Sequence, residues 1–471
     1  MSDIKFGTDG WRAIIAGPFT FENVRRLTQA IALYYKKQTL PEIPRMVVGF
    51  DRRFLSEEFA QTVAEVLAGN GIEILLSDSP CSTPVVSYAI VKRKLTAGII
   101  VTASHNPHTY SGIKIKADFG GPVAPEVTDA VEALVDQEPV RQISLEEAKH
   151  NKLIQVLNLD KDWERFVPRY VDLDLIRSRP FKVLVDSMHG TGAHAVERFL
   201  AGGKCKVTTV RGDRDAFFGG VHPEPIPRYL EASIEELKRK RYDIAVVTDG
   251  DADRIGALRP DGSFITPGQI MSLLLLHLTE NKKWTGSVVK TLSNTSLLDR
   301  IAADKGLVLH ETPVGFKHIC KLMQEEDVLI GGEESGGIGL KNYIPERDGV
   351  VLAMLLLELM AVRGKGVVKI LEEVEKKYGA FVQERWDIAY PEELKPKLMP
   401  ALKANPPEKL GTKPVAEMKT FDGVKLVAKD GSWLLYRLSG TEPILRIYAE
   451  SSSTVATRKL LRWGKELALG I

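Results

Sequence analysis

The sequence is poor in the features that mark several classes of protein. Its 471 residues include only three cysteines, Cys81, Cys205 and Cys320, which are widely spaced and form no CxxC pair. Because disulfide frameworks and thiolate zinc sites need paired cysteines, we expect neither. An excess of one charge is also absent, since 64 Lys and Arg balance 62 Asp and Glu. This balance argues against a nucleic-acid partner or a membrane-surface partner.

Long apolar runs and targeting signals are absent too. The most apolar run, 350–362, is interrupted by Glu358 and falls short of the ~18 apolar residues of a membrane span, so we interpret it as a buried helix. Residues 1–13 lack the basic segment and apolar stretch of a signal peptide. No GxxxxGK[ST] motif is present, which argues against a P-loop kinase. We therefore expect a cytoplasmic protein.

Short β-rich runs alternate with longer amphipathic stretches, as at 46–50, 97–102 and 243–247. This alternation predicts βαβ units, in which helices cover mostly parallel sheets. The pattern starts three times and is lost after about residue 375, where proline and lysine increase. The sequence therefore predicts an α/β protein with three similar mixed or parallel-sheet domains and a C-terminal α+β domain. The expected boundaries are 1–150, 151–258, 259–375 and 376–471.

A serine with basic neighbours follows the strand predicted at 97–102. Ser104 lies in the run TASHNP beside His105, and Lys114 follows in GIKIK. A serine at the carboxyl end of a parallel strand can face a ligand cleft. Alternatively, Ser104 and Asn106 only shape a turn or cap a helix. The run is not the GxSxG elbow of hydrolases.

Three aspartates alternate in the run DGDADR, after the third predicted strand of the second unit. The carboxylates of Asp249, Asp251 and Asp253 can converge on one hard cation such as Mg²⁺. An EF-hand does not fit, because Arg254 stands where that loop needs glycine and Pro260 where it needs glutamate. A solvated acidic turn is the alternative, although carboxylates this close repel one another without a cation.

Three further loops have the composition of sugar or phosphate sites. Glu333 and Ser335 in GEESGG can exchange hydrogen bonds with sugar hydroxyls, although a flexible acidic loop has the same composition. Arg437 in RLSGTEP lies beside two hydroxyls and a glycine, which suits a phosphate cradle or a β-turn with an N-cap. Arg12, in the N-terminal FGTDGWR, suits an anion or a surface loop.

The run GTGAHA at 190–195 matches a dinucleotide-binding fingerprint. Arg211 and Asp213 follow roughly where a ribose contact is expected. Glycines at a tight turn between a strand and a helix explain the run equally well. An NAD(P)-binding oxidoreductase is therefore one rival function. A Mg²⁺-dependent phosphomonoesterase, which would use the same serine and aspartates, is another.

Taken in order, FGTDGWR, TASHNP, DGDADR, GEESGG and RLSGTEP resemble the motifs of the α-D-phosphohexomutases. They span 6–443, nearly the whole chain. The resemblance implies four domains around an active site in the central cleft. It also implies transfer of a phosphoryl group between C1 and C6 of a hexose phosphate. The implied path runs through an active-site phosphoserine and a hexose 1,6-bisphosphate, which also serves as activator.

The resemblance implies roles for single residues. Ser104 would carry the phosphoryl group and, with Asp249, Asp251 and Asp253, bind one Mg²⁺ per chain. The implied catalytic neighbours are Lys114, His105, Arg254 and Arg12. The implied sugar-binding residues are Glu333 and Ser335, together with Gly315, Lys317 and His318 of the run TPVGFKH. The implied cradle for the phosphate that is not transferred consists of Arg437, Ser439, Gly440 and Thr441.

The sugar loop carries an indication of the substrate. GEESGG resembles the phosphoglucomutase version of this motif more than the GEMSGH of dual glucose/mannose enzymes or the GEQSGH of glucosamine mutases. The resemblance therefore favours interconversion of glucose 1-phosphate and glucose 6-phosphate, with phosphomannomutase or phosphoglucosamine mutase activity as the alternative. We expect a monomer or homodimer.

Overall fold

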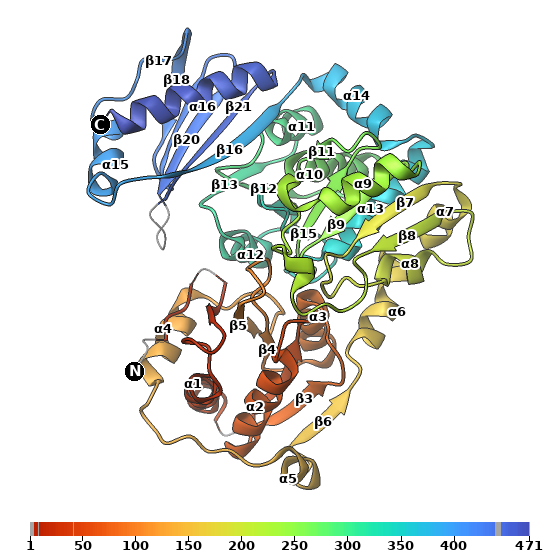
Figure 1. Cartoon of the computed structure of the whole chain (residues 1–471), viewed down its shortest axis with the longest axis vertical. Coiled ribbons are helices and arrows are strands. Elements are labelled where there is room, and N and C mark those ends of the chain that lie inside the picture. The colour runs from red at the N-terminus through yellow and green to blue at the C-terminus, as the bar shows by residue number, and fades with distance from the viewer. Residues whose placement is uncertain (1–3, 8, 41, 439–443, 471) are drawn as a thin grey trace.

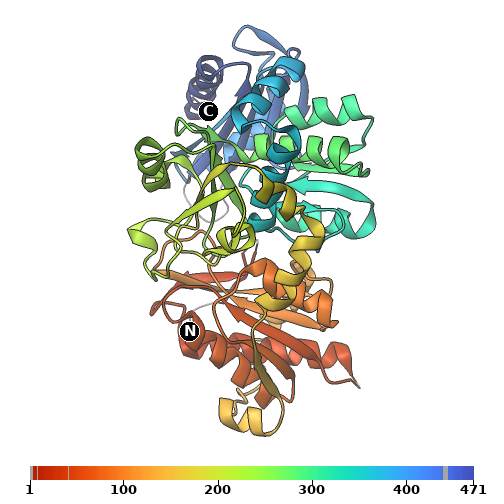
Figure 2. The ribbon, with the colours of Figure 1, turned by 90° about the vertical axis from the view of Figure 1, so that its right-hand side faces the viewer.

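The computed structural model describes residues 4–7, 9–40, 42–438 and 444–470. The chain forms four β-sheets, each with its own helices. The N-terminal domain lies at one end of the long axis and the C-terminal domain at the other, with two α/β domains between them (Figures 1 and 2).

The first domain is built on a six-stranded sheet in the order β1-β5-β4-β2-β3-β6. The strands from β4 to β6 in this order are parallel, whereas β5 runs antiparallel to both of its neighbours, β4 and β1. Its elements are β1 (Trp11–Ile14), α1 (Phe21–Thr39), β2 (Arg45–Phe50), α2 (Ser56–Gly69), β3 (Glu73–Ser77), α3 (Thr83–Arg93), β4 (Ala97–Val101), β5 (Tyr110–Ala117), α4 (Pro125–Leu134), α5 (Leu145–His150) and β6 (Ile154–Leu157).

The second domain has a five-stranded sheet in the order β11-β10-β9-β7-β8. Its elements are α6 (Asp160–Tyr170), α7 (Leu173–Ser178), β7 (Lys182–Asp186), α8 (Ala195–Leu200), β8 (Lys206–Val210), η1 (Phe218–Gly220), η2 (Pro227–Tyr229), α9 (Glu231–Arg239), β9 (Ile244–Thr248), β10 (Ile255–Leu258) and β11 (Phe264–Ile265).

The third domain has a four-stranded sheet in the order β13-β12-β14-β15. Its elements are α10 (Pro267–Leu276), η3 (His277–Asn281), β12 (Ser287–Thr291), α11 (Leu297–Lys305), β13 (Leu309–Thr312), α12 (Phe316–Glu325), β14 (Val328–Gly332), β15 (Ile338–Leu340), α13 (Gly349–Arg363) and α14 (Val367–Tyr378).

One four-strand arrangement recurs in these three sheets. A central strand (β2, β7 or β12) has a parallel neighbour on each side, and an antiparallel strand (β5, β10 or β15) follows the later neighbour (β4, β9 or β14). The first three domains therefore repeat one mixed α/β design, which confirms the predicted fold class.

The C-terminal domain differs in its sheet, which is antiparallel throughout and has the order β16-β21-β20-β19-β18-β17. Its elements are β16 (Val382–Ala389), α15 (Lys395–Ala404), β17 (Lys409–Leu410), β18 (Lys413–Lys419), β19 (Val424–Ala428), β20 (Trp433–Leu438), β21 (Ile444–Ser451) and α16 (Thr454–Leu469). The last helix, α16, packs on β21.

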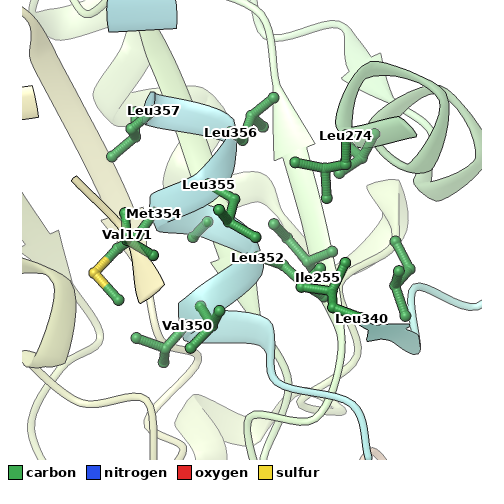
Figure 3. Close-up of a cluster of buried hydrophobic side chains, with 14 of the residues drawn as sticks. Val171, Ile255, Leu274, Leu340, Val350, Leu352, Met354, Leu355, Leu356 and Leu357 are labelled. Carbon is green, nitrogen blue, oxygen red and sulfur yellow. The ribbon is translucent and has the colours of Figure 1, made fainter. Parts of the chain in front are cut away.

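The apolar run at 350–362 forms α13, a helix buried on nearly all sides. It contacts α7 of the second domain and α10 of the third. Figure 3 shows Leu352 and Leu355 of α13 in an apolar cluster with Ile255 of the second domain and Leu274 of α10. The carboxylate of Asp348 caps the helix by accepting the Val351 N–H, and Gly364 ends it with φ +61°. This shared core joins the second and third domains.

The first two sheets extend beyond the boundaries expected at 150 and 258. β6 follows residue 150 yet pairs with β3, and β11 follows residue 258 yet pairs with β10. Both are short strands at the edge of their sheets, and such strands carry little periodic signal in the sequence.

Two expected absences can be compared with the structure. Cys81, Cys205 and Cys320 are buried and form no disulfide. Within the described ranges, no helix is both long enough and apolar enough to cross a membrane.

Candidate active site

Three of the sequence motifs occupy the same place in the repeated fold. Ser104 lies between β4 and β5, the three aspartates lie between β9 and β10, and Glu333 lies between β14 and β15. Each loop therefore starts at the carboxyl end of a parallel strand, where open α/β sheets bind ligands. A hydrogen bond between side chains brings the first two of these loops directly together.

A buried arginine shapes the serine loop. Arg53 is fully buried and donates to four backbone carbonyls of the loop, those of Ser104, Asn106, Pro107 and Tyr110, at 2.5 to 3.1 Å. Its Nε lies 3.1 Å from Asp51 Oδ2. A guanidinium has five N–H donors in a rigid fork, so one side chain can fix the whole loop.

Ser104 is held in an uncommon backbone conformation. Its φ is +51°, in the left-handed region, and its amide donates to Thr102 Oγ1 at 2.9 Å. Thr102 in turn donates to Asp51 Oδ2 at 2.6 Å. Such conformations cost of order 1–3 kcal/mol and persist where the surroundings determine them, often at functional sites. The Ser104 side chain is consequently buried and aimed in one direction.

That direction is toward the acidic loop. Ser104 Oγ donates to Asp249 Oδ2 at 2.9 Å across the boundary between the first two domains. Gly250 permits the approach, because a Cβ at this position would lie 2.5 Å from the Ser104 carbonyl oxygen. The serine and metal loops therefore form one site.

The three aspartates form a cluster suited to a divalent cation. Asp249, Asp251 and Asp253 are fully buried, and one oxygen of each lies within 4.8 Å of the others. Asp251 Oδ1 and Asp253 Oδ1 have no hydrogen-bond partner. Buried carboxylate oxygens without a donor fit a hard cation such as Mg²⁺. The loop joins two antiparallel strands rather than two helices, so an EF-hand is excluded.

The pKa values within the cluster diverge. Burial and the charges of Asp251 and Asp253 raise the pKa of Asp249 well above its usual value. Burial would also raise the pKa of Asp251, but Lys114 and the Thr83 hydroxyl outweigh burial and lower it. The pKa values of crowded carboxylates shift in opposite directions when nearby cations compensate only part of their charge.

Lys114 lies inside the cluster. Its Nζ is 2.8 Å from Asp251 Oδ2, 3.1 Å from Asp253 Oδ2 and 3.0 Å from Asp9 Oδ2. Burial alone would lower the pKa of Lys114, but these carboxylates outweigh burial and raise it. Lys114 is therefore an ammonium in this arrangement.

Two further predicted residues adjoin the serine. His105 Nδ1 lies 3.5 Å from Ser104 Oγ, at the limit of a hydrogen bond. Burial and the charges of Arg254 and Arg12 lower the pKa of His105 well below its usual value, so the imidazole is neutral at pH 7. Arg12 Nη1 donates to Asn106 Oδ1 at 2.8 Å, which places it on the serine loop.

Arg254 stands beside the acidic cluster without a close partner. Its Nε is 4.0 Å from Asp249 Oδ2 and 3.8 Å from Asp253 Oδ1, and it makes no hydrogen bond there. The backbone N–H of Arg254 instead donates to Asp249 Oδ1 at 3.1 Å. A buried guanidinium with an unused donor is well placed to bind an anion next to the cluster.

A second buried arginine was missed by the sequence analysis. Arg347 Nη2 lies 2.8 Å from Asp253 Oδ2 and 3.0 Å from Asp9 Oδ2, and its guanidinium stacks 4.9 Å from the Phe316 ring centre. It also approaches Glu333 Oε2 at 3.9 Å. Arg347 therefore connects the metal loop, the sugar loop and the start of α12.

The sugar loop presents one buried and two part-exposed side chains. Burial raises the pKa of Glu333 to about 7, although Arg347 opposes this shift. Glu334 accepts a hydrogen bond from Ser293 Oγ at 2.6 Å, and Ser335 is part-exposed. The Gly336 carbonyl accepts the Ile255 N–H at 3.1 Å, which fixes the loop against the second domain.

The residues of the run TPVGFKH lie in two different parts of the structure. Gly315 has φ +130° and precedes α12, whose first residue Phe316 stacks under Arg347. Lys317 and His318 instead line a cavity of about 710 Å³ that they share with α1 and with residues 117–127. None of the serine-loop or metal-loop residues lines that cavity. A role for Lys317 and His318 in sugar binding stays a prediction.

The structure describes only the start of the expected phosphate cradle. Arg437, at the end of β20, is half-buried and pairs with Asp422, with Nε 3.1 Å from Oδ2. Arg385 on β16 and Arg446 on β21 lie on neighbouring strands. Ser439, Gly440 and Thr441 lie outside the described residues.

The glycines of GTGAHA have a structural explanation. A Cβ on Gly190 would lie 2.6 Å from the Asp249 carbonyl, and one on Gly192 would lie 2.5 Å from Thr248 Oγ1. The Arg211 guanidinium pairs with Asp186. The turn is therefore packed against the metal loop, which accounts for its glycines without a dinucleotide.

Sequence reasoning missed Arg53 and Arg347 for a common reason. Each lies in a charged run, DRRF or ERDG, next to a strand end or a helix start. Those runs resemble ordinary solvated turns, but both arginines are almost fully buried. Their position beside the ends of predicted elements was the only available signal.

Family models match all four domains. The domains I, II and III described as phosphoglucomutase/phosphomannomutase alpha/beta/alpha domains match residues 3–142, 161–262 and 266–378, and the C-terminal domain of the same description matches 387–462.

Curated relatives match over the full length. A phosphoglucomutase/phosphomannomutase of Thermococcus kodakarensis is 31% identical over 98% of each chain. A phosphoglucosamine/phosphogalactosamine mutase of Sulfurisphaera tokodaii is 29% identical over 99% of each chain.

Solved structures share the arrangement. One from Thermus thermophilus is 34% identical over 99% of each chain, with a TM-score of 0.87. Paramecium parafusin, a phosphoglucomutase, has the same fold at 23% identity and a TM-score of 0.84, covering 99% of this chain and 95% of its own. With four matching domains and relatives aligned over the whole length, the chain belongs to the phosphoglucomutase/phosphomannomutase family of α-D-phosphohexomutases, which are intramolecular phosphotransferases.

Proposed function

We propose that this phosphohexomutase interconverts glucose 1-phosphate and glucose 6-phosphate through a phosphoserine at position 104. The observation that carries the proposal is the buried Ser104 hydroxyl, which lies 2.9 Å from Asp249 in a cluster of three buried carboxylates. A hydroxyl aimed at a cation site is the arrangement that phosphoryl transfer requires, because transfer depends on positioning and on neutralising oxygen charge.

The chemistry consists of two mirrored half-reactions. In the first, the bond between phosphorus and Ser104 Oγ breaks while phosphorus bonds to a hydroxyl oxygen of the sugar monophosphate. The hydroxyl proton ends on the serine oxygen, and glucose 1,6-bisphosphate results. The bisphosphate then turns over, and its other phosphoryl group returns to Ser104 as the serine proton ends on the sugar. Added hexose 1,6-bisphosphate would load Ser104 in the same way and act as activator.

Asp249, Asp251 and Asp253, with an oxygen of phosphorylated Ser104, are the ligands we propose for one Mg²⁺ per chain. When bound, Mg²⁺ would neutralise charge on the phosphoryl oxygens. Protein cations supply charge at the same place: Lys114 Nζ lies 2.8 Å from Asp251, and Arg254 Nε lies 3.8 Å from Asp253. We propose that Arg254 binds the phosphoryl group itself, because its buried Nε has no hydrogen-bond partner.

The sugar and its second phosphate need their own contacts. We propose that Glu333 and Ser335 bind ring hydroxyls, with Gly315, Lys317 and His318 near the sugar. Arg437, with Ser439, Gly440 and Thr441, would hold the phosphate that is not transferred. A planar guanidinium binds any phosphate dianion through two parallel bonds. The cradle can therefore accept either phosphate of the bisphosphate, as a mutase requires and a phosphomonoesterase does not.

The preferred sugar is tested by a substrate panel. Purified protein with Mg²⁺ and a trace of the matching bisphosphate is given glucose, mannose or glucosamine 1-phosphate. We expect the glucose 6-phosphate product to form fastest, and chelation of Mg²⁺ to stop its formation. Release of free phosphate in place of a 6-phosphate would instead identify a phosphomonoesterase. Faster conversion of another sugar would reassign the substrate within the family.

A further inference from the structure

We propose that Asp422 is a positioning residue, which aims the cradle arginine and fixes its distance from the sugar-binding side of the cleft. Its carboxylate contacts two domains. Oδ2 lies 3.1 Å from Arg437 Nε and also accepts the Val314 N–H at 2.7 Å, while Oδ1 accepts from Arg437 Nη2 at 3.2 Å. Arg437 belongs to the C-terminal domain, and Val314 lies between β13 and α12 of the third domain. This inference rests on the proposed function.

The pairing of Asp422 with Arg437 orients the guanidinium. Nη2 donates to Oδ1, and Nε lies at ion-pair distance from Oδ2 without making a hydrogen bond, so the carboxylate faces one edge of the guanidinium. Neither contact with Asp422 uses Nη1, which leaves this donor available to a phosphate. Both side chains are largely buried, with exposed fractions of 16% and 21%, so water competes weakly for this pair.

The backbone next to Asp422 keeps it in place. Gly423 has φ +95°, and a Cβ there would lie 2.1 Å from the Tyr436 carbonyl oxygen. The turn that carries Asp422 is therefore pressed against β20, one residue from Arg437. Only glycine allows that approach. The Asp422 carboxylate therefore has little freedom to move, so Arg437 must stay near it to keep the contact.

The bond to Val314 adds a distance constraint between domains. Val314 directly precedes Gly315, the residue before α12, and α12 begins with Phe316 under Arg347. A single carboxylate thus connects the phosphate cradle to the segment that starts at the sugar side of the cleft. In the proposed function, the phosphate that is not transferred lies at Arg437 and the sugar lies near Gly315. Asp422 therefore sets the distance that the sugar phosphate must span between them.

Other contacts cross the same boundary without touching Arg437. Gln383 Nε2 donates to the Ser293 carbonyl, and the Ser296 N–H donates to Glu450 Oε1 at 2.9 Å. These bonds hold the C-terminal domain against the third domain, and neither of them involves Arg437. Gln383 is therefore a matched control. Its truncation weakens the contact between the third and C-terminal domains but does not change the orientation of the Arg437 guanidinium.

The test compares four variants by steady-state kinetics with glucose 1-phosphate and glucose 6-phosphate. Asp422→Asn keeps an oxygen for Val314 but loses the charge on Arg437, and Asp422→Ala loses both contacts. We expect Asp422→Asn to raise KM for both substrates by about tenfold and Asp422→Ala by up to about a hundredfold, because the charged contact that orients Arg437 is lost. We expect smaller changes in kcat, partial recovery in Asp422→Glu, and a normal KM in Gln383→Ala.

Amide hydrogen exchange at Val314 gives a readout that does not depend on activity. We expect faster exchange in Asp422→Ala and near-normal exchange in Asp422→Asn. An unchanged KM for both substrates in Asp422→Asn and Asp422→Ala would overturn the proposal. An equal rise of KM in Gln383→Ala would also overturn it, because docking alone would then explain the effect. If the wild-type protein shows no mutase activity, the proposed function fails, whereas the exchange result still decides whether Asp422 holds Val314.

Discussion

At the scale of single residues, the serine loop depends on one buried arginine. Arg53 donates to four carbonyls of the serine loop and pairs with Asp51. A buried cation is costly to remove, because its partners are left without donors. The conformation of Ser104 therefore depends on a residue that does not face the cleft.

Replacement of Arg53 tests this dependence. We expect Arg53→Ala to lower the free energy of unfolding by about 3–5 kcal/mol, because a buried ion pair and several hydrogen bonds are lost. Arg53→Lys should recover part of the stability and little activity, since one ammonium cannot reach four carbonyls. Chemical denaturation and mutase assays measure the two effects. Full activity in Arg53→Lys would contradict the role of the guanidinium fork.

Glu333 makes stability and activity respond to pH in opposite directions. Burial raises its pKa to about 7 in the folded protein, above the value in an unfolded chain. Its contribution to stability is therefore complete at acidic pH and is lost as the pH rises through about 7, by on the order of 3 kcal/mol. The ionised form of Glu333, which would accept a sugar hydroxyl in the proposed function, forms as the pH rises through about 7, so kcat/KM should rise.

The matched variant is Glu333→Gln. Thermal unfolding at pH 5 and pH 8 should show Glu333→Gln gaining stability relative to the wild type at the higher pH. Its kcat/KM should be low and should lose the rise near pH 7. A stability difference that is the same at both pH values would show that Glu333 does not titrate in this range.

At the scale of elements, the site is assembled by close contact between loops at equivalent positions of repeated domains. The serine loop after β4 touches the metal loop after β9, and Gly250 allows the contact. Because the backbones of these two loops are in close contact, even one added methyl group would force them apart.

Gly250→Ala probes that junction. The added Cβ would lie 2.5 Å from the Ser104 carbonyl, so the two loops must separate. Misplacement of reacting groups by about 1 Å can cost roughly a hundredfold in rate, and we expect a loss of this order in kcat. Gly366→Ala is the control, because a Cβ there meets nothing within 4 Å and its φ is −68°. Equal activity of both variants would contradict the close contact.

The repeated strands and the buried helix at 350–362 were predictable because their apolar residues follow a clear pattern. β18 and β13 were missed, since β18 is half-exposed (KPVAEMK) and β13 is a short polar run (LHET). The serine and the three aspartates could be predicted because they directly follow buried strands. Arg347 and Asp422 could not, because their partners come from other domains and are remote in sequence.

At the scale of the whole molecule, the groups of the proposed active site come from different domains. The cradle arginine lies in the C-terminal domain, while the serine and the metal loop lie in the first two. In the proposed function, this separation lets one phosphate be held while the other is transferred. It also distinguishes a mutase from a phosphomonoesterase, which has no need to retain a second phosphate.

Arg437→Ala tests the division of labour. We expect KM for glucose 1-phosphate and glucose 6-phosphate to rise together, by roughly ten- to a hundredfold, because either phosphate must use the same guanidinium. Phosphorylation of Ser104 by a small donor without a second phosphate should change much less. Quench-flow measurement of released bisphosphate should show more escape of the intermediate. An unchanged KM for both sugars would place the cradle elsewhere.

The most direct test of a phosphoserine at position 104 is to locate the phosphoryl group on the protein. Wild-type protein and Ser104→Ala are incubated with glucose 1,6-bisphosphate and Mg²⁺, and each is analysed by intact mass and peptide mapping. The proposed phosphoserine mechanism predicts one phosphate on the wild type, located at Ser104, and none on Ser104→Ala, which should fold normally but have lost nearly all mutase activity. A phosphate on another residue, or an active wild-type enzyme that never carries one, would contradict it.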